Sequence, residues 1–100
     1  MEIIEVVANN LKALRYHHDH SQSRFAQLTG IDKGRISKYE NMKIEMRIST
    51  MFNIGHAYKI NPMYLFVEST GHFDIWLSLA KDSYNKCDTI LDVLDYLENY

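Results

Sequence analysis

The amino-acid sequence predicts an all-α protein. Apolar residues recur at spacings of three and four through most of the 100 residues, which is the period of one helix face. Gly occurs four times and Pro once, too few for a chain with many turns. The apolar share of 46% is enough for a packed core. We therefore expect one helical domain, with at most a short appendage.

The first expected helix carries Ile4, Val7, Leu11 and Leu14 on one face and ends near residues 17–20. Ser21 is expected to cap a second helix, which Gly30 ends by taking a left-handed conformation. Asp32 is expected to cap a third helix, because its charge suits the positive helix end. The residues expected to face inward from the second and third helices are Phe25, Ala26, Leu28, Ile36 and Tyr39.

A loop over residues 41–48 leads to a fourth helix, for which Ser49 is the expected cap. Asn61 and Pro62 predict the start of a short fifth helix, a capping side chain followed by Pro at the first helical position. The expected inner residues are Met51, Ile54, Tyr58, Leu65 and Phe66.

The tail after the turn at residues 69–71 shows two apolar stripes, which predict two further helices, the second capped by Asp88. The first stripe consists of Phe73, Trp76, Leu77, Ala80 and Tyr84. The second stripe consists of Cys87, Ile90, Leu91, Leu94 and Leu97.

Charge divides the chain into two unlike halves. Residues 1–47 hold eight basic and six acidic side chains, whereas residues 48–100 hold three basic and seven acidic ones. Such halves can have different partners. The acidic N-terminus does not resemble a signal peptide, a single Cys fits a reducing compartment, and no apolar run is long enough to span a membrane. We expect a cytoplasmic protein.

The second helix, the short turn and the third helix have the spacing of a helix-turn-helix, whose second helix enters the major groove of DNA. The stretch SQSRFAQLTGIDKGRISKYEN resembles the helix-turn-helix of the Cro and lambda-repressor-like group, the XRE family. STMFNIGHAYKINPMYLF resembles the fourth and fifth helices of the same family. The resemblance covers roughly residues 8–67 and implies a five-helix lambda-repressor-like domain, followed by a C-terminal helical extension of about two helices.

Several residues depart from the family pattern. Met42 and Met46 stand where a Gly and a Pro are common, so we expect the loop after the third helix to differ in shape. Arg24 replaces an acidic residue, which removes the reciprocal capping box. Gly34 lies near the start of the third helix, where it costs about 1 kcal/mol relative to Ala.

The resemblance implies a sequence-specific regulator of transcription, a repressor of the kind found in phages, mobile elements and bacterial chromosomes. Lys33 and Lys38 can donate to guanine O6 and N7, and Arg35 and Lys43 suit phosphates. The full set of expected DNA-binding residues is Gln22, Lys33, Gly34, Arg35, Ser37, Lys38, Asn41 and Lys43.

We expect a DNA-binding domain over residues 1–68 and a dimerisation extension over residues 69–100, because one such module reads only a few base pairs. The expected dimer contacts are Phe73, Trp76, Leu77, Ile90, Leu94 and Leu97. The alternative is an antitoxin-like protein, whose acidic C-terminal part binds a partner protein and which represses its own operon.

No catalytic constellation, cofactor motif or metal site is expected. His17, His18 and His20 are close in sequence but lack a second ligand cluster at zinc spacing. Cys87 lies on an apolar stripe without a Cys/His signature around it. The sequence therefore favours a DNA-binding protein over an enzyme.

Overall fold

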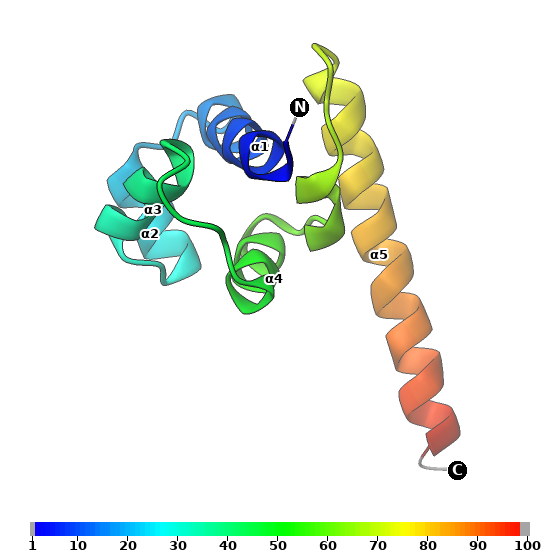
Figure 1. The fold of residues 1–100 in the computed structure, drawn as a ribbon. Coiled ribbons are helices and arrows are strands. Elements are labelled where there is room, and N and C mark those ends of the chain that lie inside the picture. The colour runs from blue at the N-terminus through cyan, green and yellow to red at the C-terminus, as the bar shows by residue number, and fades with distance from the viewer. Residues whose placement is uncertain (1, 99–100) are drawn as a thin grey trace.

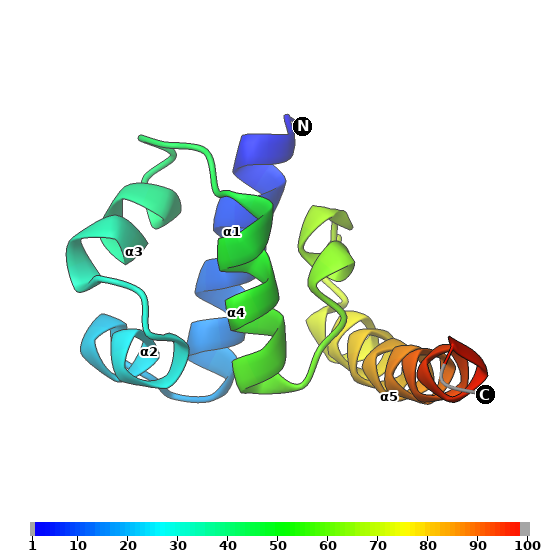
Figure 2. The same ribbon diagram turned by 90° about the horizontal axis from the view of Figure 1, so that it is seen from below.

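The computed structural model describes the backbone of residues 2–98 and the side chains of residues 2–86. Every regular element in this part of the chain is helical, which confirms the all-α prediction. In order, the elements are α1 Ile3–His17, α2 Gln22–Thr29, α3 Lys33–Glu40, α4 Ile48–Tyr58, the 3-10 helix η1 Pro62–Phe66 and α5 Phe73–Glu98. In both ribbon views α2 and α3 lie on one side of α1 and α4, and α5 lies on the opposite side (Figures 1 and 2).

The core joins all six elements. Its largest fully buried side chains are Leu11, Leu14, Phe25, Ile36, Met51, Ile54, Ile60 and Leu65. These positions include half of the residues before the tail that were expected to face inward, and Val7, Tyr39 and Tyr58 are also buried. Leu28 is an exception, because 38% of its surface remains exposed at the end of the short α2. Phe66 is likewise 38% exposed, so that prediction was also wrong.

The expected start signals of the helices are confirmed in three of five cases. The side chains of Ser21 and Asp32 accept hydrogen bonds from the backbone N–H groups of the third residues of their helices, Arg24 at 3.0 Å and Arg35 at 3.3 Å. Asn61 Oδ1 accepts from the N–H of Met63 at 3.0 Å. The prediction for Ser49 was wrong: α4 already begins at Ile48, so Ser49 lies inside the helix, beyond the capping position.

The tail forms one helix instead of the two expected ones. No Gly or Pro interrupts residues 73–98, so nothing in the sequence ends the helix once it has begun. Asp88 lies within α5 and therefore does not cap a separate helix. The last turns of α5 project beyond the rest of the chain (Figure 1).

The first half of α5 packs onto the domain through Trp76, Leu77 and Ala80, which are 3%, 6% and 0% exposed. Phe73 is half-buried against the same core. Burial leaves Trp76 and Leu77 almost no surface for a second copy, so their expected role as dimer contacts was wrong. The side chains of Ile90, Leu94 and Leu97 lie outside the described residues.

The carbonyl of Val67, just after η1, accepts hydrogen bonds from side chains of both α1 and α5 and so joins these elements. The amide of Asn10 donates to the carbonyls of Leu65 and Val67, both at 2.9 Å. The indole N–H of Trp76 donates to the carbonyls of Tyr64 at 3.0 Å and Val67 at 2.9 Å. The start of the expected extension is therefore bound to the same core as the expected DNA-binding domain.

Candidate nucleic-acid interface

The turn between α2 and α3 has the conformation that a helix-turn-helix requires. Gly30 follows α2 with φ 73°, in the left-handed region that glycine adopts without strain. The hydroxyl of Thr29 donates to the carbonyl of Phe25 at 2.7 Å and accepts from the N–H of Ile31 at 3.3 Å. These bonds fix the path of the chain from one helix to the next.

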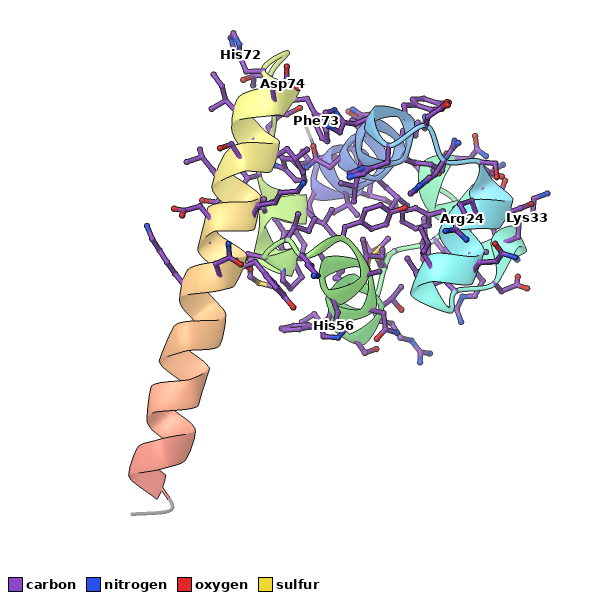
Figure 3. All side chains as sticks on the ribbon, turned by 180° about the vertical axis from the view of Figure 1, so that it is seen from behind. Arg24, Lys33, His56, His72, Phe73 and Asp74 are labelled. Atoms are coloured by element: carbon purple, nitrogen blue, oxygen red, sulfur yellow. The ribbon has the colours of Figure 1, made fainter. Side chains whose placement is uncertain are left out.

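One side of α3 is buried and the other is open. Ile36 and Tyr39 are 0% and 3% exposed and hold α3 against the domain. Lys33, Arg35 and Lys38 are exposed. Figure 3 shows Lys33 at the outer edge of the α2–α3 unit and Arg24 in front of the same unit, both on the side of the molecule away from α5.

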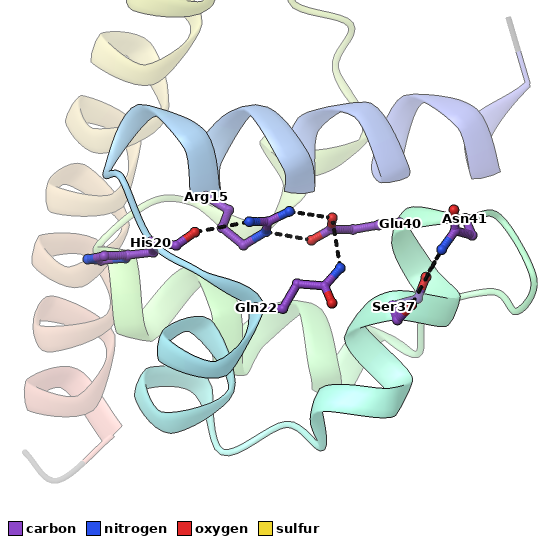
Figure 4. A network of polar contacts seen from close by, with 6 residues as sticks. All are labelled: Arg15, His20, Gln22, Ser37, Glu40 and Asn41. Carbon is purple, nitrogen blue, oxygen red and sulfur yellow. Dashed lines mark hydrogen bonds and ion pairs between the residues drawn. The ribbon is translucent and has the colours of Figure 1, made fainter.

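Glu40, the last residue of α3, is buried and forms an ion pair with Arg15 of α1 (Figure 4). The guanidinium donates from Nε to Oε2 at 2.9 Å and from Nη2 to Oε1 at 2.8 Å, and Nη1 donates to the carbonyl of His20 at 3.0 Å. The hydrogen bonds to Glu40 raise the pKa of Arg15 above its ordinary value. This two-bond geometry sets the end of α3 against α1.

This pair was not predicted from the sequence. A signal was present, because Arg15 lies four residues after Leu11 and therefore on the inner side of α1. An arginine at such a position needs a buried acidic partner.

Pairing inside the domain leaves the surface of the α2–α3 unit basic. Its exposed basic side chains are Arg24, Lys33, Arg35, Lys38 and Lys43. Residues 21–43 contain two acidic residues: Glu40 is neutralised by Arg15, and Asp32 caps α3. The acidic net charge of the whole chain thus conceals a basic face.

The remaining predicted DNA-binding residues lie on the same unit but differ in their contacts. Gln22 donates from Nε2 to Glu40 Oε1 at 3.3 Å, so the ion pair orients its amide. Asn41 Nδ2 donates to the carbonyl of Ser37 at 2.9 Å. A Cβ on Gly34 would lie 3.0 Å from Asp32 Oδ2. The structure thus brings all eight predicted residues to one unit, and their contact with DNA stays a prediction.

The loop after α3 begins with a Schellman motif, in which two backbone bonds close the helix end. The N–H of Lys43 donates to the carbonyl of Lys38 at 2.8 Å, and the N–H of Met42 donates to the carbonyl of Tyr39 at 3.2 Å. Met42 takes φ 57°. The residue that replaces the family's common Gly therefore keeps the left-handed conformation that Gly favours.

The histidines between α1 and α2 pack around Tyr58 of α4. His20 Nδ1 lies 2.8 Å from the Tyr58 hydroxyl, and the His18 ring packs edge-on against the Tyr58 ring at 4.9 Å between centroids. Burial raises the pKa of Tyr58 to about 12. Among the side chains that the structure describes, no group of three His, Cys, Asp or Glu residues could hold a metal ion.

The turn at Gly30, the two capped helices and the exposed basic side chains of α3 define a helix-turn-helix protein of the DNA-binding class. The family model HTH_3, described as helix-turn-helix, matches residues 11–65. The chain belongs to this family, the XRE and Cro/lambda-repressor type of DNA-binding transcription regulator. No curated protein and no solved structure matches the chain. None of the helices in the described part is both long and apolar enough to cross a membrane.

Proposed function

We propose that the protein is a sequence-specific repressor that binds its operator as a homodimer and reads the major groove with α3. The observation that carries this proposal is the basic surface of the α2–α3 unit, on which Lys33 at the start of α3 and Lys38 near its end are exposed, whereas Ile36 and Tyr39 are buried. Exposed lysines at this position can reach base edges once the helix enters the groove.

The other polar groups of the unit fit contacts to the DNA backbone. Arg35 lies beside Tyr39, with its guanidinium carbon 5.9 Å from the ring centroid, and Lys43 lies on the open turn after α3. Both are suited to phosphates, which position the protein without reading sequence. Gln22 at the start of α2 can donate to a phosphate on the opposite side of the groove.

Repression follows from occupancy of the site. One α3 presents only a few side chains to bases, so a dimer on a two-fold site is needed for useful specificity. A bound dimer covers the operator and excludes other proteins from it.

A second candidate is an antitoxin-like protein that binds a basic partner protein and represses its own operon. The observation that favours it is the composition of residues 88–98, which contain Asp88, Asp92, Asp95 and Glu98 and no basic residue. A small toxin-like reading frame beside this gene would favour this candidate.

Selection of bound fragments from random double-stranded DNA tests the proposal. The expected result is one enriched sequence with two-fold symmetry, whose half-sites lie about one helical turn, roughly 34 Å, apart. Recovery of no enriched sequence at low salt would contradict sequence-specific binding.

A further inference from the structure

A second surface of α5 differs from the side that packs on the core. Ile75 and Leu79 are 59% and 50% exposed, although Trp76 and Ala80 beside them are buried. Val67 is 48% exposed and, with Ile75 and Leu79, lines an open groove of about 270 Å³. Large exposed apolar side chains that gather in this way mark an interaction surface more often than single ones do.

The exposed residues continue along α5 as a stripe at spacings of four and three. Ile75 and Leu79 are followed by Asp82 and Lys86, which form an ion pair within the helix at 3.0 Å between Lys86 Nζ and Asp82 Oδ2. Both charged side chains are exposed. In the helical register, Ile90, Val93 and Leu97 follow on the same side of the backbone. We call the stripe formed by these seven residues the outer stripe of α5.

The charges of the outer stripe are complementary to those of a second copy of the stripe that runs in the opposite direction. Two such helices related by a two-fold axis near residue 84 run antiparallel. In this arrangement Asp82 of one copy is level with Lys86 of the other, and Lys86 with Asp82, as an isologous interface requires. Ile75 is then level with Val93, and Leu79 is level with Thr89, in the other copy. A parallel pairing in register would place Asp82 against Asp82 and Lys86 against Lys86.

We propose that the outer stripe of α5 binds a second copy of this chain in an antiparallel arrangement. The inference rests on the proposed function and deepens it, because it names the surface that joins the two copies. The surface is distinct from Trp76 and Leu77, which hold α5 to its own domain. Antiparallel pairing also places the projecting end of each α5 over the exposed Ile75 and Leu79 of the partner.

A charge-reversal experiment tests the pairing across copies. In Asp82→Lys and in Lys86→Asp, each homodimer has like charges both within its helix and across the interface. Each variant alone should therefore dimerise about tenfold more weakly than the wild type, or worse. An equimolar mixture of the two variants keeps the like charges within each helix but restores both opposite-charge pairs across the interface. The mixture should form a heterodimer that native mass spectrometry resolves by mass.

Two further variants control for other causes. Lys81→Asp removes a basic charge from an exposed position of α5 outside the stripe and should dimerise like the wild type. Leu79→Asp should be monomeric at concentrations at which the wild type is a dimer. Far-UV circular dichroism and the emission of the buried Trp76 should show that every variant is folded.

Three results would overturn the inference: a monomeric wild type at micromolar concentrations, failure of the mixed variants to pair, or equal weakening by Lys81→Asp. Binding to DNA is measured separately on the selected site. A chain that binds that site but does not pair through α5 overturns this inference and leaves the proposed DNA binding intact.

Discussion

Arg15 and Glu40 join α1 to the last residue of α3 through two hydrogen bonds of 2.8 and 2.9 Å. The two side chains are only 10% and 4% exposed. Because the pair is largely removed from water, each charge depends on the other for its stability. The position of α3, and thus of Lys33 and Lys38, depends on this contact.

We expect Glu40→Gln to lower the free energy of unfolding by about 3 kcal/mol or more, because it leaves the Arg15 charge buried without an ionised partner. Arg15→Met should have a similar effect. The double variant Arg15→Met with Glu40→Met buries no unpaired charge, so its loss should be clearly smaller than the sum of the single losses. Urea unfolding monitored by circular dichroism measures all of them, and strictly additive losses would contradict a direct coupling.

Met42 offers a stabilising substitution. Its φ of 57° places a side chain in the left-handed region, where a non-glycine residue costs about 1–2 kcal/mol. Met42→Gly should therefore raise the midpoint of thermal unfolding, by an amount corresponding to about 1 kcal/mol after the larger entropy of the unfolded glycine is subtracted. Lys43→Gly is the matched control, because φ of Lys43 is not positive. A gain for the control equal to that for Met42→Gly would refute the explanation.

Two helical glycines should respond differently to Ala. A Cβ on Gly55 would lie 2.8 Å from the carbonyl oxygen of Ile60 and 3.0 Å from Pro62 Cδ, so α4 and η1 would have to separate. We expect Gly55→Ala to destabilise the protein by about 1–3 kcal/mol, typical of overpacking. A Cβ on Gly34 would approach only the end of the exposed Asp32 side chain, so Gly34→Ala should be neutral or stabilising by up to about 1 kcal/mol. Chemical denaturation measures the free energy of unfolding of both variants. A larger loss of stability in Gly34→Ala than in Gly55→Ala would contradict this prediction.

The arginine and lysine contacts on α3 should differ in their dependence on salt. Arg35→Ala should weaken binding to all sequences by similar factors and reduce the slope of log K against log salt by about 1, because one phosphate contact is lost. Lys38→Ala should instead relax the preference at one position of the site. Titrations of the selected site and of an unrelated duplex at several salt concentrations separate the two effects, and loss of preference in Arg35→Ala would reverse the assignment.

The sequence predicted those features that depend on local chemistry. Ser21, Asp32 and Asn61 cap helices because their side chains bond to backbone groups two or three residues away. The burial of Leu11, Leu14, Ile36 and Ile54 was likewise predicted from the spacing of apolar residues within each helix. The period of the helix decides which side chains share the face that packs on the core.

Features that depend on contacts between distant residues were missed. Arg15 and Glu40 lie 25 residues apart, and nothing local shows that they meet. The sequence showed that Trp76 and Leu77 need cover, but not that the segment around η1 supplies it, so they were predicted to contact a second copy. The prediction of two helices in the tail was wrong. The apolar residues shift from one side of the helix to another along the tail, but such a shift does not by itself end a helix.

The binding of the Lys33→Ala/Lys38→Ala double variant to the DNA site selected by the wild type tests the central claim most directly. Fluorescence anisotropy would compare it with Lys59→Ala/Lys81→Ala, which removes two exposed lysines away from the α2–α3 unit. Each lost base contact is worth about 1–3 kcal/mol. We therefore expect the α3 variant to bind its site at least about tenfold more weakly and the control to bind like the wild type. Equal affinities of the α3 variant and the wild type, with both proteins folded, would contradict reading of DNA by α3.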